Sequence, residues 1–189
     1  MLRGFLDVLA ARRGQLGAGT LFLASSAGAL YAGGANGSPC SEADVPAPIS
    51  AYGHAKLACE HAVRRYGLRT GDDVQVGRIA NLYGPGQNLA KGQGLISHLC
   101  LGYLTAQPVS IYVSLDTIRD YLFVDDCAEM VCDMFDLGGP PGALPGEPVV
   151  KVLASQQPTT IAGLIATCRQ VFKRPLRLPS AVRRTPDSR

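Results

Sequence analysis

The sequence predicts an α/β fold, in which short apolar strands alternate with amphipathic helices along a chain of 189 residues. Three segments carry this prediction. Residues 21–24 form an apolar run that leads into a loop rich in serine and glycine, as a buried strand does. Residues 51–66 repeat apolar side chains at helical spacing, and residues 74–79 alternate as a short strand. The hydrophobic content of 47% is enough for one sizeable core.

Residues 2–13 are predicted to form an amphipathic helix, because their leucines and Phe5 follow helical spacing. The glycines of residues 14–19 then suggest a nucleotide-binding loop. Such a loop must follow a strand and open a helix, so that free backbone N–H groups face the phosphates. Here a helix precedes the glycines and a strand follows them, so the sequence does not support a phosphate site in this segment.

The helix predicted over residues 51–66 carries the candidate chemistry, Tyr52 and Lys56. Ser50 suits its N-cap, and Gly67 stands where a helix usually stops. A tyrosine and a lysine four residues apart share a helix face, so their side chains can meet. A phenol is a poor base at neutral pH, but a nearby ammonium favours its ionised form, which can remove or return a hydroxyl proton. The alternative is a half-buried tyrosine beside a lysine that extends to solvent.

Two other pairs of residues on this helix are expected to have structural roles only. Glu60 and Arg64 are four residues apart and are expected to form an exposed ion pair. His54 and His61 lie off the face of the tyrosine–lysine pair and are expected at the surface or in packing. No metal site is predicted.

Composition excludes several classes of partner. The chain has 18 basic and 15 acidic residues, a net charge of +3 and no long basic block, which argues against nucleic acid. Its six cysteines are scattered, with no C-x-x-C motif and no histidine at zinc-ligand spacing. We therefore expect reduced, mostly buried thiols in a cytoplasmic protein. No apolar run approaches the roughly 20 residues of a membrane span.

The second half of the chain continues the alternation of strands and helices. We expect a helix over 95–103, strands over 109–113 and 120–124, a helix after Asp126, and a strand over 149–153. Asp126 and Glu129 form a variant capping box for the middle helix. Thr159 is expected to cap a last helix with a clean apolar face, formed by Ile161, Leu164, Ile165, Cys168, Val171 and Phe172.

Four segments in this order are similar to those of a known family. They are residues 22–31 (FLASSAGALY), 52–56 (YGHAK), 78–88 (RIANLYGPGQN) and 119–126 (RDYLFVDD). Together they resemble the extended short-chain dehydrogenase/reductase family, specifically its NAD-dependent sugar-nucleotide epimerases and dehydratases. The resemblance extends from about residue 20 to residue 173. It implies the C-terminal part of a doubly wound parallel, Rossmann-like sheet with a small substrate-binding lobe.

This resemblance also predicts the domain organisation. Residues 1–88 would be the remainder of an NAD-binding domain that lacks its glycine-loop half. Residues 89–173 would form a mixed substrate-binding lobe with returning Rossmann elements, and residues 174–189 a basic tail. Roughly 90 residues of cofactor-binding fold would be absent, judging from the size of βαβ units. The chain is then either a fragment of a longer enzyme or a short protein without most of its dinucleotide site. We favour the fragment.

The resemblance assigns the proton chemistry and the nicotinamide contacts. Tyr52 would be the catalytic acid/base, and Lys56 would tune it and hold the nicotinamide ribose. Both residues therefore count as cofactor-binding. The backbone around Ile79 would lie against the nicotinamide.

The catalytic hydroxyl departs from the family pattern. Many members place a serine or threonine four residues before the position of Tyr31, where this chain has Ala27. Ser26 is the expected substitute, and Ser25 is expected to pack or to lie near the cofactor. The alternative for both is a serine that ends a strand and bonds local backbone.

Two residues are expected to bind the nucleotide sugar. The guanidinium of Arg119 offers a planar donor fork suited to a diphosphate, and the family uses the matching arginine in this way. Its alternative is a surface ion pair with Asp116 or Asp120. Asn81 matches a residue that reaches the sugar nucleotide, its alternative being a turn-forming asparagine.

The expected function is therefore NAD-dependent epimerisation or dehydration of a nucleoside-diphosphate sugar. Two alternatives stay open: a non-catalytic remnant that binds a partner or a sugar nucleotide, and a reductase of a non-sugar substrate. The sequence leaves open the sugar, the choice between epimer and dehydrated product, and the oligomeric state, a homodimer included.

Overall fold

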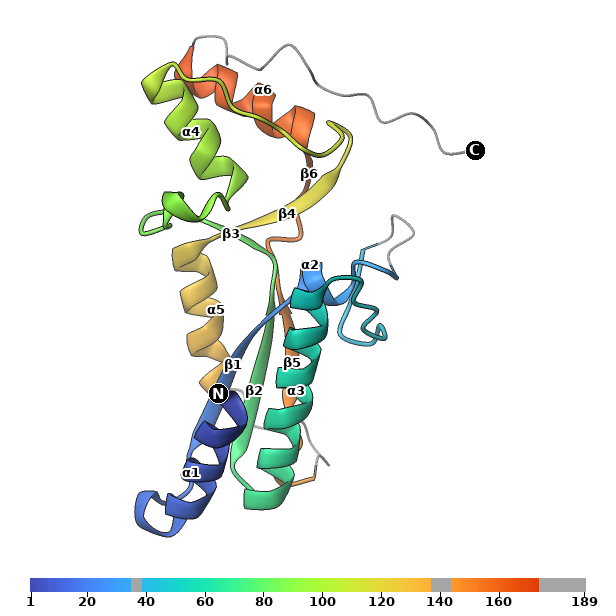
Figure 1. The fold of residues 1–189 in the computed structure, drawn as a ribbon, viewed down its shortest axis with the longest axis vertical. Helices are drawn as coiled ribbons and strands as arrows, with labels where there is room; N and C mark the ends of the chain where they lie inside the picture. Colours follow the sequence, from blue (N-terminus) through green and yellow to red (C-terminus); the bar gives the residue numbers. More distant parts are fainter. Residues whose placement is uncertain (35–38, 137–143, 174–189) are drawn as a thin grey trace. The chain divides into compact units, whose positions relative to one another are not determined.

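Figure 1 shows the computed structural model, which describes residues 1–34, 39–136 and 144–173. The chain forms two compact units. The first comprises Met1–Ala80 and Asp126–Leu153, and the second comprises Asn81–Asp125 and Ala154–Arg189. Each unit is therefore discontinuous in sequence, and each is described by itself.

The first unit is built on a parallel sheet of three strands, in the order β1 (Thr20–Ser26), β2 (Asp73–Ile79), β5 (Val149–Leu153). The prediction of an α/β fold with a parallel sheet is confirmed. In register, Ser26 lies beside Ile79. Since parallel strands end at the same edge of a sheet, the residues that follow β1 and β2 meet at one edge, where α/β folds hold their ligands.

Helices cover both faces of this sheet. On one face lie α1 (Leu2–Leu16) and α3 (Ala51–Thr70), side by side in Figure 1. They close a core with the inward side chains of β2, formed by Leu6, Ala62, Val63, Tyr66, Val74 and Val76. On the opposite face the ring of Phe22 in β1 contacts Phe135 of α5 (Val124–Asp136), with ring centroids 6.1 Å apart. This is the doubly wound arrangement that the resemblance implied.

The long helix α3 confirms one predicted terminus and corrects the other. The Ser50 hydroxyl accepts from the Gly53 N–H at 3.0 Å, so Ser50 is the N-cap as predicted. The predicted stop at Gly67 is wrong, because the helix continues to Thr70 and ends at Gly71 in the left-handed conformation (φ 71°). A side chain at Gly67 would collide with the backbone of Gly146, so this glycine serves close packing.

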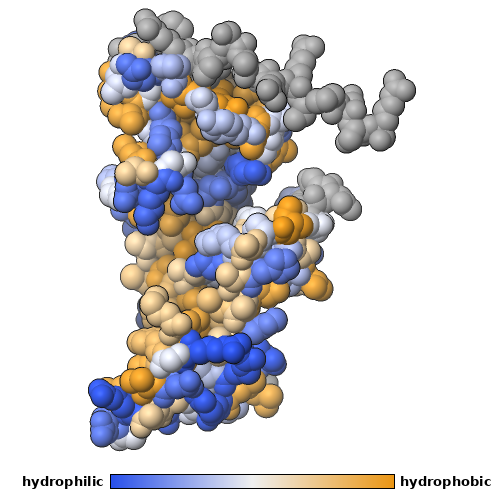
Figure 2. All heavy atoms as spheres, in the orientation of Figure 1, coloured by the Kyte–Doolittle hydropathy of each residue, from blue (hydrophilic) through white to orange (hydrophobic). Residues whose placement is uncertain are grey.

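β1 is an edge strand. It pairs with β2 along one side, and no described residue pairs with the other. The side chains of Leu21, Phe22 and Leu23 are only half-buried, whereas the residues between the two ends of β2 are all buried. Figure 2 shows residues of hydrophobic character reaching the surface over β1 and α5. A short helix, α2 (Ala27–Leu30), follows β1 directly.

The second unit holds a smaller mixed sheet and two packed helices. In its sheet β4 (Ile118–Phe123) pairs in parallel with β3 (Asn81–Tyr83) and antiparallel with β6 (Pro158–Thr160). A short 3₁₀ helix, η1 (Leu89–Lys91), precedes α4 (Leu95–Thr105). The core lies between α4 and α6 (Ile161–Phe172) and contains Leu99, Tyr103, Val109, Ile161, Leu164, Ile165 and Cys168.

Several expectations for this half are wrong in detail. Residues 109–113 form no strand, although Val109 is buried in the core of the second unit. The cap of α6 is Thr160, whose hydroxyl accepts from the Gly163 N–H, one residue after the predicted Thr159. Val171 is exposed rather than part of the apolar face.

The start of α5 and the burial of the cysteines also differ from expectation. The helix begins at Val124, immediately after β4, so Asp126 lies in its first turn instead of capping it. Cys127 and Cys168 are buried, but Cys40 and Cys132 are exposed, so the cysteines are less buried than predicted. None of the described helices combines the length and apolar character needed to cross a membrane.

Candidate functional site

Tyr52 and Lys56 lie side by side at the carboxyl end of β1. Tyr52 is in the first turn of α3 and is 57% exposed. The Lys56 ammonium donates to the backbone oxygen of Ala24 at 2.9 Å and lies 5.6 Å from the centroid of the Tyr52 ring. The helix therefore presents a phenol and an ammonium together beside the last residues of β1. A phenol with a cation this close is suited to proton transfer with a hydroxyl group that approaches from solvent.

Ser26 and Ile79 end the two strands next to this pair. Ser26 is half-buried and precedes α2, yet its side chain makes no capping hydrogen bond to that helix. The Ser26 hydroxyl therefore does not make the hydrogen bond to local backbone that a serine at the end of a strand commonly makes. Ala27, which stands where many relatives have a hydroxyl, is buried. The catalytic role of Ser26 and the nicotinamide contact of Ile79 remain predictions.

Ser25 belongs to a buried polar network that sequence reasoning missed. Its hydroxyl donates to Glu60, whose carboxylate also receives two hydrogen bonds from the Arg78 guanidinium, at 2.8 and 3.2 Å. The predicted exposed pair of Glu60 with Arg64 is wrong, because Arg64 bonds Glu147 instead. The signal was present in the sequence: an arginine in a strand with apolar neighbours on either side of the sheet needs a partner if it is buried. The role of Ser25 toward a cofactor stays a prediction.

The hydrogen bonds within this network stabilise the charged form of Arg78. Burial opposes the charged form of Arg78, but its hydrogen bonds to Glu60 and Tyr31 hold the pKa of the guanidinium above its ordinary value. Burial raises the pKa of the Tyr31 phenol, and the neighbouring Arg78 only partly offsets it. The Arg78 guanidinium is therefore held in its charged form, and the Tyr31 phenol in its neutral form.

The second unit brings Asn81 and the Arg119 segment together. Asn81 opens β3, and its side-chain amide donates to the Asp120 backbone oxygen at 3.0 Å. Arg119 is exposed, and its guanidinium donates to the Ile118 backbone oxygen. The Asp120 carboxylate accepts hydrogen bonds from the backbone N–H and the hydroxyl of Ser155. Within the described part of the chain Arg119 therefore forms no ion pair, and most of its donors remain open to an anion.

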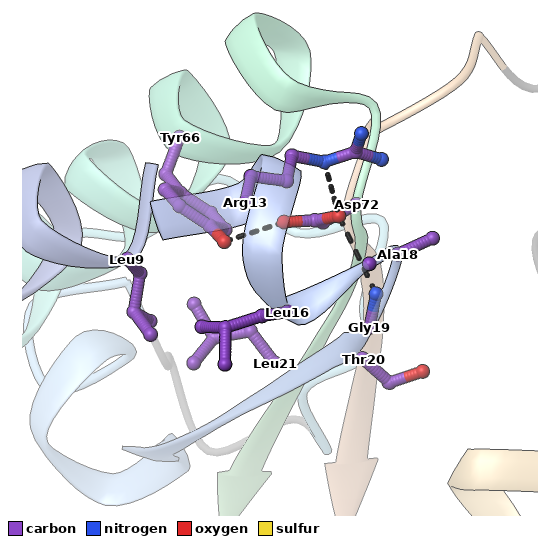
Figure 3. A pocket seen from close by; sticks show the side chains of 10 residues that line it. Leu9, Arg13, Leu16, Ala18, Gly19, Thr20, Leu21, Tyr66 and Asp72 are labelled. Carbon is purple, nitrogen blue, oxygen red and sulfur yellow. Dashed lines mark hydrogen bonds and ion pairs between the residues drawn. The ribbon is translucent and has the colours of Figure 1, made fainter. Parts of the chain in front are cut away.

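A separate pocket of about 140 Å³ lies at the opposite end of β1. Figure 3 shows its polar wall, where Asp72 lies between Arg13 and Tyr66. The Gly17–Gly19 loop on its rim follows the C-terminus of α1, where carbonyl groups repel anions. Ligands of α/β sheets bind at the carboxyl ends of the strands. We therefore place the candidate site at Tyr52 and not in this pocket.

Asp72 owes its charge to its hydrogen bonds in this pocket. Burial alone would raise the pKa of the carboxyl, but hydrogen bonds from Tyr66, Arg13 and the Gly19 N–H outweigh that effect. The pKa of Asp72 consequently lies below its ordinary value. Through these hydrogen bonds Asp72 connects α1, α3 and the residue before β1.

Comparisons with known proteins agree with the geometry. The family model described as NAD dependent epimerase/dehydratase matches residues 2–143. A UDP-glucose 4-epimerase from Rhizobium meliloti is 32% identical over 187 aligned residues, which cover 88% of this chain and 53% of the relative. A dTDP-L-rhamnose 4-epimerase from Burkholderia thailandensis is 32% identical over 87 residues, 46% of this chain and 24% of the relative.

A solved structure shows the same fold. The UDP-glucose 4-epimerase of Thermotoga maritima with UDP-glucose matches 94% of this chain and 56% of its own, with a TM-score of 0.73 and 26% identity. The chain thus spans between about a quarter and just over half of the length of these relatives.

Proposed function

The chain is a member of the NAD dependent epimerase/dehydratase family, and from that premise we propose that it serves NAD-dependent epimerisation or dehydration of a nucleoside-diphosphate sugar. The observation that carries the proposal is the Tyr52–Lys56 pair at the carboxyl end of β1, where Lys56 binds the backbone oxygen of Ala24. Ser25 and Ser26 are the next two residues of this strand. Relatives named as epimerases of nucleotide sugars support the substrate class.

The residues around the pair fit the nicotinamide end of NAD. An ammonium has three hydrogens, and Lys56 donates one to Ala24, which leaves two for the hydroxyls of a ribose. Ser25 and Ile79 complete the proposed cofactor contacts beside it. NAD, when bound, supplies a reversible acceptor for the hydride of the sugar carbon. Among the described residues no strand-to-helix turn carries a G-x-G-x-x-G pattern, so these residues do not fit the diphosphate of NAD.

Each residue of the site has a defined part in the proposal. Tyr52 takes the proton from the reacting sugar hydroxyl, and later returns it. Lys56 stabilises the phenolate, and Ser26 hydrogen-bonds the reacting oxygen so that it faces Tyr52. Arg119 binds the diphosphate of the substrate through its open donors, and Asn81 binds the nucleotide sugar.

The finer assignments follow from the same premise. Residues 1–88 serve the cofactor, with the exception of Asn81, and residues 89–173 serve the substrate together with returning elements of the sheet. In this proposal the chain uses no metal, nucleic acid or membrane. Thiols without C-x-x-C pairing suit the cytoplasm, and a homodimer is the proposed assembly.

Calorimetric titration with NAD tests the proposal. Because the described residues fit the nicotinamide end of NAD and not its diphosphate, we expect the chain to bind NAD weakly. The Lys56→Met variant should bind at least about tenfold more weakly still, because two ribose hydrogen bonds are lost. Lys91→Met, in η1 of the second unit, is the matched control and should bind as the unchanged chain does. Equal affinity of the chain and Lys56→Met would overturn the assignment of Lys56.

A second candidate is a binding protein without chemistry. The missing fit to the cofactor's diphosphate favours it for this chain. It predicts no measurable heat with NAD, but binding of UDP-glucose that depends on Arg119. Both candidates predict that Arg119→Gln binds UDP-glucose more weakly, so the titration with NAD is the measurement that separates them.

A further inference from the structure

The buried network behind the tyrosine–lysine pair has a defined path. It begins at the Ser41 backbone oxygen, which accepts from the Tyr31 hydroxyl at 2.8 Å. The Arg78 guanidinium donates to the same Tyr31 oxygen, and with its other nitrogens it donates to both carboxylate oxygens of Glu60. The Ser25 hydroxyl donates to Glu60 as well. Each side-chain nitrogen and oxygen of Ser25, Glu60 and Arg78 therefore has a hydrogen-bond partner.

The network is sealed from solvent. Ser25, Glu60 and Arg78 are 5%, 7% and 6% exposed. Removing a carboxylate and a guanidinium from water is costly, and a pair of apolar side chains would fill the same space at similar or better stability. Stability alone therefore gives no reason for this ion pair. Where buried ionic groups are retained, their best-supported use is to fix one arrangement among several.

The arrangement that this network fixes is the end of β1. Glu60 lies one turn after Lys56 and two turns after Tyr52 on the same face of α3. Through its carboxylate it holds Ser25, which stands between Ala24 and Ser26. Ala24 supplies the backbone oxygen that binds the Lys56 ammonium. One buried carboxylate thus joins the helix that carries Tyr52 and Lys56 to the strand residues on either side of Ser25.

We propose that Glu60, Arg78 and Ser25 are positioning residues, which hold the Ala24 oxygen against Lys56 and so keep the ammonium beside Tyr52. None of the three touches the reacting atoms in this role. Arg78 locks the orientation of the Glu60 carboxylate, the carboxylate holds the Ser25 hydroxyl, and Ser25 fixes the backbone of its neighbour Ala24. The inference rests on the proposed function of the pair, but its geometry can be measured without cofactor or substrate.

The experiment measures the rate at which the Lys56 amine is methylated by formaldehyde with cyanoborohydride as the reductant, and mass spectrometry follows each lysine separately. In the unchanged chain the hydrogen bond to Ala24 slows this reaction. Ser25→Ala removes the link to Glu60 and leaves the ion pair intact. We expect it to raise the Lys56 rate about threefold or more, the size of a lost hydrogen bond. Lys91 and Lys151 in the same sample serve as internal references. Ser114→Ala, a serine of the second unit, is the control variant.

Ser25→Thr keeps a hydroxyl at this position and should restore the slow rate, which a general loosening of the core would not do. A Lys56 rate that stays unchanged in Ser25→Ala would overturn the inference. Glu60→Gln is the second variant: if folded, it should also raise the rate, and if it unfolds, the Ser25 variants decide. A raised Lys56 rate in a chain that binds no NAD would support the positioning role while the proposed function fails.

Discussion

At the residue scale, the charged side chains inside the first unit show how far local rules reach. The i,i+4 rule paired Glu60 with Arg64, because it considers only neighbours on one helix. The actual partner, Arg78, lies on a strand 18 residues further along and contacts Glu60 only once the sheet has formed. Tyr52 and Lys56, by contrast, were predictable as neighbours, since both lie on one helix face.

Asp72 gives a prediction about pH at this scale. Because the pKa of its carboxyl is lower in the folded chain than its ordinary value of 3.8, the unfolded chain takes up the proton first as the pH falls. The stabilisation is therefore complete above that value and is lost as the pH falls through the folded-state pKa. Asp72→Asn should lower the free energy of unfolding by about 1–3 kcal/mol at pH 7.

Chemical denaturation of both proteins between pH 7 and pH 2.5 measures this difference. We expect the two stability curves to converge at the acid end. Asp116→Asn, an exposed carboxylate of the second unit, should lie close to the unchanged chain throughout. A difference between the chain and Asp72→Asn that is constant with pH would contradict the assignment.

At the element scale, caps and stripes identified helices well, and alternation alone misidentified a strand. Residues 109–113 have the apolar pattern of a strand, but a strand also needs a partner. Here Val109 instead packs into the core between α4 and α6. Gly67 was taken as a stop because glycine commonly ends helices. Its real role, close contact with Gly146, depends on a segment 79 residues away and could not be read locally.

The Ser50 cap is the element whose loss should affect the candidate site most directly. Ser50→Ala removes the hydrogen bond to the Gly53 N–H and should cost about 1 kcal/mol of stability. It should also increase amide hydrogen exchange in the first turn of α3, which contains Tyr52, while exchange in the last turns stays unchanged. Ser50→Asp keeps a capping oxygen and should exchange as the unchanged chain does. An increase in exchange that is equal along the whole of α3 in Ser50→Ala would contradict a local effect of the cap.

At the scale of the whole molecule, the sequence pattern predicted the layers but not the order of the strands. The pattern of residues 149–153 does not indicate that they pair with β2. Between β2 and this strand the chain passes through the second unit and returns along α5, so the two strands are far apart in the sequence. The resemblance, and not periodicity, supplied the parallel sheet. Periodicity cannot show which strand lies at an edge, and so the open side of β1 was not predicted.

This open side leads to a prediction about association. β1 contains no charged residue and no proline, the features that normally keep edge strands apart. We expect sedimentation velocity to show association that grows with concentration, and Thr20→Lys at the exposed start of β1 to reduce it. Thr167→Lys on α6 is the matched control. Association that is equally strong in Thr20→Lys would assign the contact to another surface.

Proton transfer by Tyr52 is the central step of the proposed function, and conversion of UDP-glucose in the presence of NAD measures it most directly. We predict that Tyr52→Phe lowers the rate about 10²–10⁴-fold, the usual contribution of a positioned acid/base. Tyr112→Phe, an exposed tyrosine of the second unit, should convert the sugar at the rate of the unchanged chain. Turnover by Tyr52→Phe equal to that of the unchanged chain, or no turnover by either, would contradict the account.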